Sequence, residues 1–188
     1  MKVLFCTSEA APFAMTGGLG DVSAALPSAL RNRMVGCRVV MPLYEDIADK
    51  YREKMTFITS IVVPVSWRRQ YCGIFEAKEG NVTYYFIDNQ YYFKRHGLYG
   101  YYDDAERFAF FSRAILEMLP AIGFFPDIIH CNDWQTALVP TYLSLFYRQN
   151  EGFENIKTVL TVHNIQYQGK YGMEILEDVL GIPMDKKP

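Results

Sequence analysis

Apolar segments typical of buried strands alternate along this chain with segments whose apolar residues recur at helical spacing. We expect strands over 2–8, 37–44, 127–131 and 157–164, and helices over 20–33, 103–123 and 134–148. Near-continuous apolar strands joined by helices are typical of a parallel sheet that is covered on both faces. The sequence therefore predicts an α/β fold built on a Rossmann-like, mostly parallel sheet with helices on both faces.

Three further β-rich runs follow one another over 57–67, 71–80 and 81–89 with little helix between them. The turn sequence Lys-Glu-Gly-Asn at 78–81 predicts that the last two runs form a β-hairpin, as an insertion or an antiparallel edge of the sheet. The segment from residue 177 reads as a helix that runs into a proline-bounded stop. No internal repeat or low-complexity linker divides the chain, so residues 1–188 are expected to form one domain.

Composition excludes several classes of function. Half of the residues are hydrophobic, 21% are charged and the formal net charge is −2, which gives no electrostatic basis for binding nucleic acid or an anionic membrane. No apolar run approaches the roughly 20 residues of a membrane span, and the N-terminal run is too short for a secretory signal. Four scattered cysteines without zinc-ligand spacing are expected to be buried, reduced thiols. We therefore expect a cytoplasmic protein.

The chemically unusual segments all follow predicted strands. They read "TSEAAPFAMTGGLGD", "MPLYED", "HCNDWQTA" and "VHNIQYQGKYG". In an open parallel sheet the ligand binds beyond the carboxyl ends of the strands. These four segments are therefore expected to share one edge of the sheet and to form a binding cleft there.

The stretch "MTGGLGD" at 15–21 places Gly17, Gly18 and Gly20 where the first strand passes into the first helix. Glycines allow a sharp turn and a close approach, and a helix N-terminus suits an anion such as a phosphate. The loop is neither G-x-G-x-x-G nor a P-loop, and Met41–Pro42 replaces the acid that a dinucleotide-binding enzyme needs after its second strand. A tight turn in which Asp21 only favours the first helical turn is the alternative.

Two later strands also end in polar residues. His130, Asn132 and Asp133 close one strand before Trp134, and His163 and Asn164 close the next. Asp133 could simply cap the following helix, Trp134 could simply pack, and a histidine at a strand end is often structural. Their position on one shared edge favours a binding site instead.

Six blocks in colinear order together resemble the N-terminal domain of bacterial glycogen synthases and plant starch synthases. They are "SEAAPFAMTGGLGDV", "ALPSAL", "VVMPLY", "YYFKRHGLYGYYDDAERFAFFSRA", "DIIHCNDWQTALVPTYL" and "TVHNIQYQG". The resemblance implies the N-terminal half of a GT-B fold, in which two Rossmann-like lobes face each other across a cleft. It implies a retaining glucosyltransferase that extends the α-1,4-glucan glycogen from ADP-glucose, without a metal or another cofactor.

The resemblance also implies roles for individual residues. Asp21 and His163 would be catalytic, with Asp21 beside the reacting glucose and His163 supporting the charge that develops at its anomeric carbon. The amides of Gly17, Gly18 and Gly20 would approach the phosphate and glucose of the donor. The remaining substrate-binding residues implied are Tyr99, Asp133, Trp134, Asn164 and Gln168.

Two departures from the family pattern bear on activity. The glycine loop usually begins with lysine, and Met15 stands in its place, which removes a cation that would contact phosphate or glucan. Lys2, Arg95 and Lys170 are the candidate substitutes. The C-terminal nucleotide-binding lobe is missing, so we expect the chain as given to be inactive alone. A non-catalytic glucan-binding or regulatory module of the same family is the alternative function, and the choice between ADP-glucose and UDP-glucose stays open.

Overall fold

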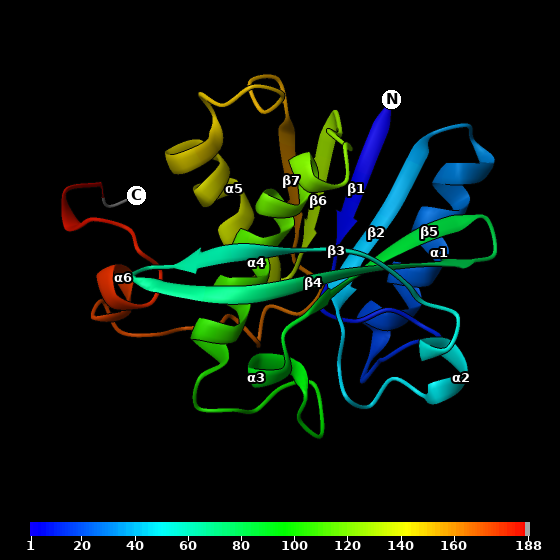
Figure 1. The fold of residues 1–188 in the computed structure, drawn as a ribbon, viewed down its shortest axis with the longest axis horizontal. Coiled ribbons are helices and arrows are strands. Elements are labelled where there is room, and N and C mark those ends of the chain that lie inside the picture. Colours follow the sequence, from blue (N-terminus) through cyan, green and yellow to red (C-terminus); the bar gives the residue numbers. More distant parts are fainter. Residues whose placement is uncertain (187–188) are drawn as a thin grey trace.

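Seven strands form one sheet in the order β3-β4-β5-β2-β1-β6-β7 (Figure 1). The computed structural model describes residues 1–186. The strands are β1 Lys2–Cys6, β2 Gly36–Pro42, β3 Thr56–Val65, β4 Arg68–Glu79, β5 Val82–Asp88, β6 Ile128–Asn132 and β7 Lys157–Thr161. Strands β5, β2, β1, β6 and β7 pair in parallel, whereas β3 and β4 extend the sheet antiparallel. The predicted α/β sheet with an antiparallel hairpin is confirmed.

The helices cover both faces of this sheet. They are α1 Gly18–Asn32, α2 Asp49–Arg52, α3 Gln90–Phe93, α4 Asp104–Ala121, α5 Leu138–Tyr142 and α6 Ile175–Asp178. The connection through α1 leads from β1 toward β2, whereas those through α4 and α5 lead in the opposite direction across the sheet. Because parallel crossovers are right-handed, α1 lies on one face and α4 with α5 on the other.

The core lies between these layers. The central strands are almost wholly apolar, and Leu4, Phe5, Val39 and Val40 have no solvent exposure. Helix α4, the longest helix over the sheet, contributes aromatic side chains that include the fully buried Phe110 and Phe111. Burial on both faces is what a parallel sheet requires.

The hairpin predicted at 78–81 joins β4 to β5 through Gly80, whose φ of 57° favours glycine. The second hairpin, β3–β4, crosses in front of α4 toward α6 (Figure 1). At its tip the hydroxyl of Ser66 donates to the carbonyl of Glu177 at 2.6 Å, and the indole N–H of Trp67 donates to Asp178 at 2.9 Å. The antiparallel strands thus hold the segment around α6 against the rest of the domain.

The helix predicted over 134–148 is broken into three pieces. A 3₁₀ turn over Trp134–Thr136 is followed by α5 and then by a π-helical turn over Leu143–Tyr147. Pro140 lies within this stretch and has no N–H for a regular i→i−4 bond, so the ladder cannot run through it unbroken.

The other boundaries differ by a few residues. Strand β7 ends at Thr161 instead of 164, and the short helices α2 and α3 were not predicted. Asn89 explains α3, because its side chain accepts a hydrogen bond from the amide of Tyr92 at 3.0 Å. The predicted C-terminal helix is the single turn α6, which begins earlier, at Ile175. Positions 187 and 188 lie outside the described residues.

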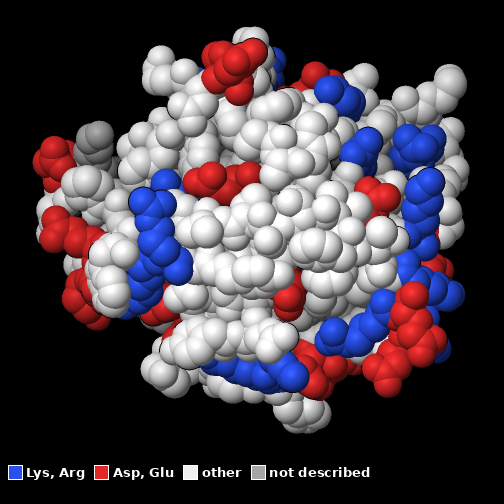
Figure 2. Space-filling view, viewed as in Figure 1, with Lys and Arg blue, Asp and Glu red and all other residues white. Residues whose placement is uncertain are grey.

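Acidic and basic side chains are intermixed around the rim of the face in Figure 2, and its centre is mostly uncharged. Within residues 1–186, no helix combines the length and apolar character of a membrane span. All four cysteines, Cys6, Cys37, Cys72 and Cys131, are free and buried, as the sequence predicted.

Candidate functional site

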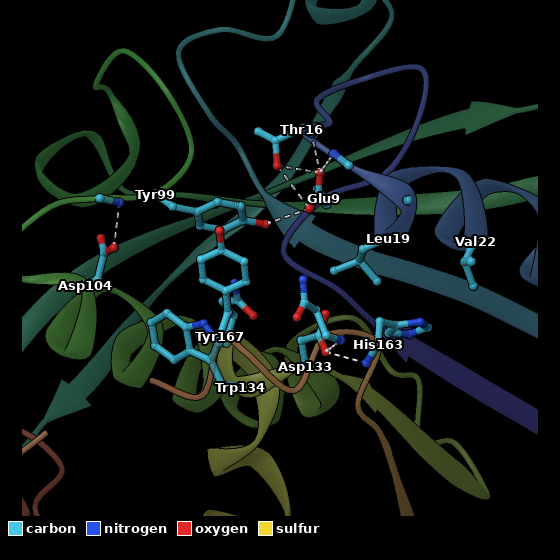
Figure 3. A pocket seen from close by; sticks show the side chains of 15 residues that line it. Glu9, Thr16, Leu19, Val22, Tyr99, Asp104, Asp133, Trp134, His163 and Tyr167 are labelled. Atoms are coloured by element: carbon cyan, nitrogen blue, oxygen red, sulfur yellow. Dashed lines mark hydrogen bonds between the residues drawn. The ribbon is translucent and has the colours of Figure 1, made fainter. Parts of the chain in front are cut away.

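A cavity of about 870 Å³ opens at the carboxyl ends of β1, β6 and β7 (Figure 3). The connections from β1 and β6 leave to opposite faces here, and such a reversal is where ligand crevices form in open sheets. The lining residues are Glu9, Thr16, Gly17, Gly18, Leu19, Val22, Tyr99, Gly100, Asp104, Asp133, Trp134, Gln135, His163, Asn164 and Tyr167. Three of the four unusual segments therefore meet, as the sequence predicted; no residue of "MPLYED" lines the cavity.

Glu9 is a buried carboxylate beneath the glycine loop, with 5% of its surface exposed. Its Oε2 accepts hydrogen bonds from the backbone amides of Thr16 and Gly17, the latter at 3.3 Å. Its Oε1 accepts one from the hydroxyl of Tyr99 at 3.2 Å. The amides of Thr16 and Gly17 are therefore occupied by the side chain of Glu9 and are not available to a bound phosphate.

The three glycines of the loop differ in what their backbones can offer a ligand. Gly17 donates to Glu9, and Gly20 donates to the carbonyl of Gly17 at 3.1 Å. Within residues 1–186 no hydrogen bond uses the amides of Gly18 and Leu19, which stand at the N-terminus of α1. An anion at this point would therefore meet Gly18 and Leu19 first.

Gly20 is required by packing. A Cβ there would lie 2.5 Å from the Cβ of Met15, so a larger residue would displace the loop. Met15 itself is 46% exposed and does not line the cavity.

The three candidate substitutes for the missing lysine lie elsewhere. Lys2 stands at the amino end of β1, on the opposite edge of the sheet, with its Nζ 5.6 Å from the ring centroid of Phe124. Arg95 is bound to Asp103 by two hydrogen bonds of 2.7 and 2.8 Å. Lys170 borders a smaller, neighbouring hollow. Lys2 is therefore wrong as a substitute, and Arg95 is already paired.

Asp133 joins the loops that follow β6 and β7. Its φ of 57° is rare for a residue with a side chain. Its Oδ1 accepts hydrogen bonds from the amides of His163 at 2.7 Å and Asn164 at 3.4 Å. It makes no side-chain hydrogen bond to the turn that follows it, so the capping interpretation is wrong.

The ring of His163 is held by a hydrogen bond to Asn132 at the end of β6. Its Nε2 lies 2.9 Å from Oδ1 of Asn132, which is fully buried at the end of β6. The neighbouring His130 places its Nε2 2.8 Å from Oγ1 of Thr161. Burial, followed by repulsion from His163, lowers the pKa of His130.

Trp134 forms one wall and packs edge-on against Phe108, with ring centroids 5.1 Å apart. Gly169 lies directly on the indole, because a Cβ there would be 2.3 Å from Cε3 of Trp134. Gln168, predicted to bind substrate, donates to the carbonyl of Ile165 at 2.6 Å and lines the neighbouring hollow of about 360 Å³ instead of the main cavity.

The opposite wall precedes α4. Tyr99 shares its hydroxyl with Ser8 at 2.7 Å, and burial is the main cause that raises its pKa. Gly100 donates its amide to Asp104 at 2.9 Å, and Asp104 in turn pairs with the fully buried Arg107 at 2.6 Å. This network fixes the backbone on which Tyr99 stands.

Most of the predicted site residues meet in the cavity. Those that line it are Gly17, Gly18, Tyr99, Asp133, Trp134, His163 and Asn164. Asp21, predicted as catalytic, lies exposed in the first turn of α1 and is not a lining residue, although Leu19 and Val22 on the same helix are.

Sequence reasoning gave no role to Glu9 or Asn132. The signal for Glu9 was a single acid in an otherwise apolar and small-residue run after a strand. Asn132 was singled out by position, but its partners come from two other strands. In the part of the chain that the structure describes, no group of three or more His, Cys, Asp or Glu side chains could hold a metal ion.

Comparison with known proteins agrees with this geometry. Residues 2–187 match the family model described as the starch synthase catalytic domain. The chain is 54% identical over 182 residues to a glycogen synthase of Geobacillus thermodenitrificans and 49% identical over 185 residues to one of Lactobacillus acidophilus. These matches cover 97% and 98% of this chain but only 38% and 39% of the relatives, so the chain spans less than two fifths of their length.

A solved structure has the same fold. It is described as the catalytic domain of starch synthase IV from Arabidopsis thaliana bound to ADP and acarbose. It matches with a TM-score of 0.90 and 32% identity, over 98% of this chain and 38% of that one. The sequence blocks, the fold and these matches agree, and the chain belongs to the starch synthase catalytic domain family.

Proposed function

We propose that this chain is the N-terminal lobe of a retaining glucosyltransferase that transfers glucose from ADP-glucose to the end of an α-1,4-glucan. The observation that carries the proposal is the single cavity into which the glycine loop, Asp133–Trp134 and His163–Asn164 converge. The related starch synthase, with 32% identity over this region, is described as bound to ADP and acarbose, which resemble a spent donor and a glucan.

The cavity offers matched groups for the two substrates. The free amides of Gly18 and Leu19 suit a phosphate of the donor, where negative charge grows as the bond to ADP breaks. His163 and Asp133 line the same cavity, and the proposal places the glucose ring of the donor beside them. The flat faces of Trp134 and Tyr167 suit the apolar faces of acceptor sugars. The proposal keeps Asp21 beside the reacting glucose because it lies in the same region of α1 as Leu19 and Val22, which line the cavity.

A second lobe is part of the proposal. Val162, Ile165 and Tyr167 follow β7 at the rim of the site, and they are 58%, 74% and 70% exposed. A facing lobe would cover these side chains, complete the nucleotide site and keep water from competing with the acceptor. We place the enzyme in the cytoplasm, where its buried free thiols would stay reduced.

A chimera tests the proposed reaction. This chain replaces the matching N-terminal part of the Geobacillus thermodenitrificans glycogen synthase, and incorporation of labelled glucose into glycogen is measured with ADP-glucose and with UDP-glucose. We expect incorporation by the chimera and none by the chain alone. Preference for either nucleotide identifies the donor that the paired lobe accepts.

The control separates a failed reaction from a failed fold. A His163→Ala chimera should lose most incorporation and keep the far-UV circular dichroism of the parent chimera. If the parent chimera folds and binds glycogen but incorporates no glucose, the chain is a glucan-binding module. Met15 in the glycine loop is the observation that favours this second candidate.

A further inference from the structure

We propose that Asn132 is a positioning residue that fixes the tautomer of His163, so that His163 presents an unprotonated Nδ1 to the cavity. Nδ1 of His163 then accepts a hydrogen bond from a hydroxyl group of the ligand. The inference rests on the proposed function for the identity of the ligand as a sugar, but its first step concerns the protein alone.

The orientation of the Asn132 amide follows from its two backbone partners. Its Nδ2 lies 3.0 Å from the carbonyl oxygen of Cys6 and 3.2 Å from that of His130. Carbonyl oxygens only accept, so the nitrogen must face them and Oδ1 must face the other way. Asn132 is fully buried, so bulk water cannot replace either carbonyl as the partner of its amide nitrogen.

The orientation of Asn132 decides the tautomer of His163. Oδ1 of Asn132 lies 2.9 Å from Nε2 of His163 and can only accept, so Nε2 must carry the hydrogen. In the neutral ring Nδ1 is then a bare acceptor. Within residues 1–186 no hydrogen bond uses Nδ1, and His163 lines the cavity.

The charged neighbours of His163 do not offer a competing partner for its ring. Asp133 is close, but its Oδ1 accepts from the backbone amides of His163 and Asn164. His130 is bound to Thr161, and burial followed by repulsion from His163 lowers the pKa of His130, which disfavours its charged form. An acceptor at Nδ1 selects a donor such as a sugar hydroxyl and disfavours an unprotonated phosphate oxygen.

Nitrogen NMR of this chain tests the tautomer directly, since only His96, His130 and His163 contribute imidazole signals. At neutral pH we expect His163 to show a protonated Nε2 and an unprotonated Nδ1. A protonated Nδ1 in the unmodified chain, or equal populations of the two tautomers, overturns the proposal.

The Asn132→Asp variant tests the role of Asn132. A carboxylate against Nε2 stabilises the imidazolium, so the titration of His163 should move upward by about 1–3 pH units. Thr161→Val is the matched control, because it removes the partner of His130 and should leave His163 unchanged. If N132D folds and the titration of His163 does not move, Asn132 has only a structural role.

A titration with maltotriose and, separately, with inorganic phosphate tests the ligand. Maltotriose should shift the Nδ1 signal of His163, and phosphate should not. If phosphate alone shifts it, the hydroxyl-reading role is wrong. If the tautomer is as expected but maltotriose binds neither to the chain nor to the chimera, the proposed function fails and the proton assignment stands.

Discussion

Glu9 gives the glycine loop its shape at the scale of single residues. A short loop rich in glycine has many conformations when unfolded, and ordering it costs entropy. The carboxylate of Glu9 offsets that cost with bonds to the amides of Thr16 and Gly17 and to the hydroxyl of Tyr99. The same three hydrogen bonds couple the loop after β1 to Tyr99 in the wall before α4, so one buried side chain links two sides of the cavity.

Replacing Glu9 by glutamine should destabilise the domain. The variant loses the charge behind these hydrogen bonds and points an N–H₂ group at one set of donors, at a cost of about 1.5–3 kcal/mol in unfolding free energy. Urea unfolding measures the loss. Glu79→Gln, in an exposed position at the β4–β5 turn, should change stability by less than about 0.5 kcal/mol. Equal losses in E9Q and E79Q would contradict the structural role of Glu9.

Restoring a lysine at Met15 should raise activity. A charge-assisted contact to a phosphate or glucan oxygen is worth about 1.5–3 kcal/mol, or about 10- to 100-fold in kcat/KM of the chimera. Met34→Lys is the control, since Met34 is 95% exposed and lies before β2 at the far edge of the sheet. A Met15→Lys chimera no faster than the Met34→Lys chimera would show that position 15 does not reach the substrates.

At the scale of elements, the loop after β7 packs directly on Trp134 through Gly169. Gly169 combines a φ of 56° with a ring of Trp134 where a Cβ would stand. Any side chain must therefore push the loop off the wall of the cavity, and Tyr167 moves with it.

The Gly169→Ala variant should change the fluorescence of Trp134 and weaken binding of maltotriose. Gly80→Ala is a matched control, because Gly80 has a φ of 57° and nothing within 4 Å of an added Cβ. Both variants carry the strain of a positive φ, about 1 kcal/mol, and only G169A adds the collision. If G80A and G169A lose the same stability and leave the fluorescence unchanged, the added Cβ at position 169 does not displace the loop from Trp134, and the prediction is wrong.

Local sequence patterns predict elements well where one period is clear. The strands β1, β2 and β6 and the helices α1 and α4 match their predicted positions within a few residues. The stretch after Asp133 fails because its apolar spacing does not reveal the break at Pro140 or the π turn behind it. Short helices such as α3 depend on one capping side chain, which a periodic pattern does not contain.

At the scale of the whole molecule, the sheet edge on which the site lies could be predicted from the sequence. The hydrogen-bond partners within the site could not. The carboxyl ends of parallel strands share an edge in any such sheet, so the convergence of Asp133 and His163 followed from their order. Glu9 meets Tyr99 across 90 residues, and Asn132 meets Cys6 across 126. No spacing rule links positions that far apart, and only the folded chain shows these partners.

The pH dependence of global stability should carry the signature of His130. Burial and repulsion from His163 lower its pKa, so below about 6.5 the unfolded chain holds more protons than the folded one. The contribution of His130 to the free energy of unfolding is therefore complete above about pH 6.5. It is lost as the pH falls toward the lowered pKa of His130 in the folded state. Urea unfolding between pH 5 and 8 should show this decline.

Replacing His130 by glutamine should flatten that decline, because glutamine does not titrate and can still reach Thr161. His96→Gln is the control, since the side chain of His96 is 99% exposed and its removal leaves the partly buried ring of His130 in place. An unchanged slope in H130Q would assign the acid sensitivity to another group. A flattened slope in H130Q alone would tie the acid sensitivity of the whole fold to the strand that positions Asn132 and His163.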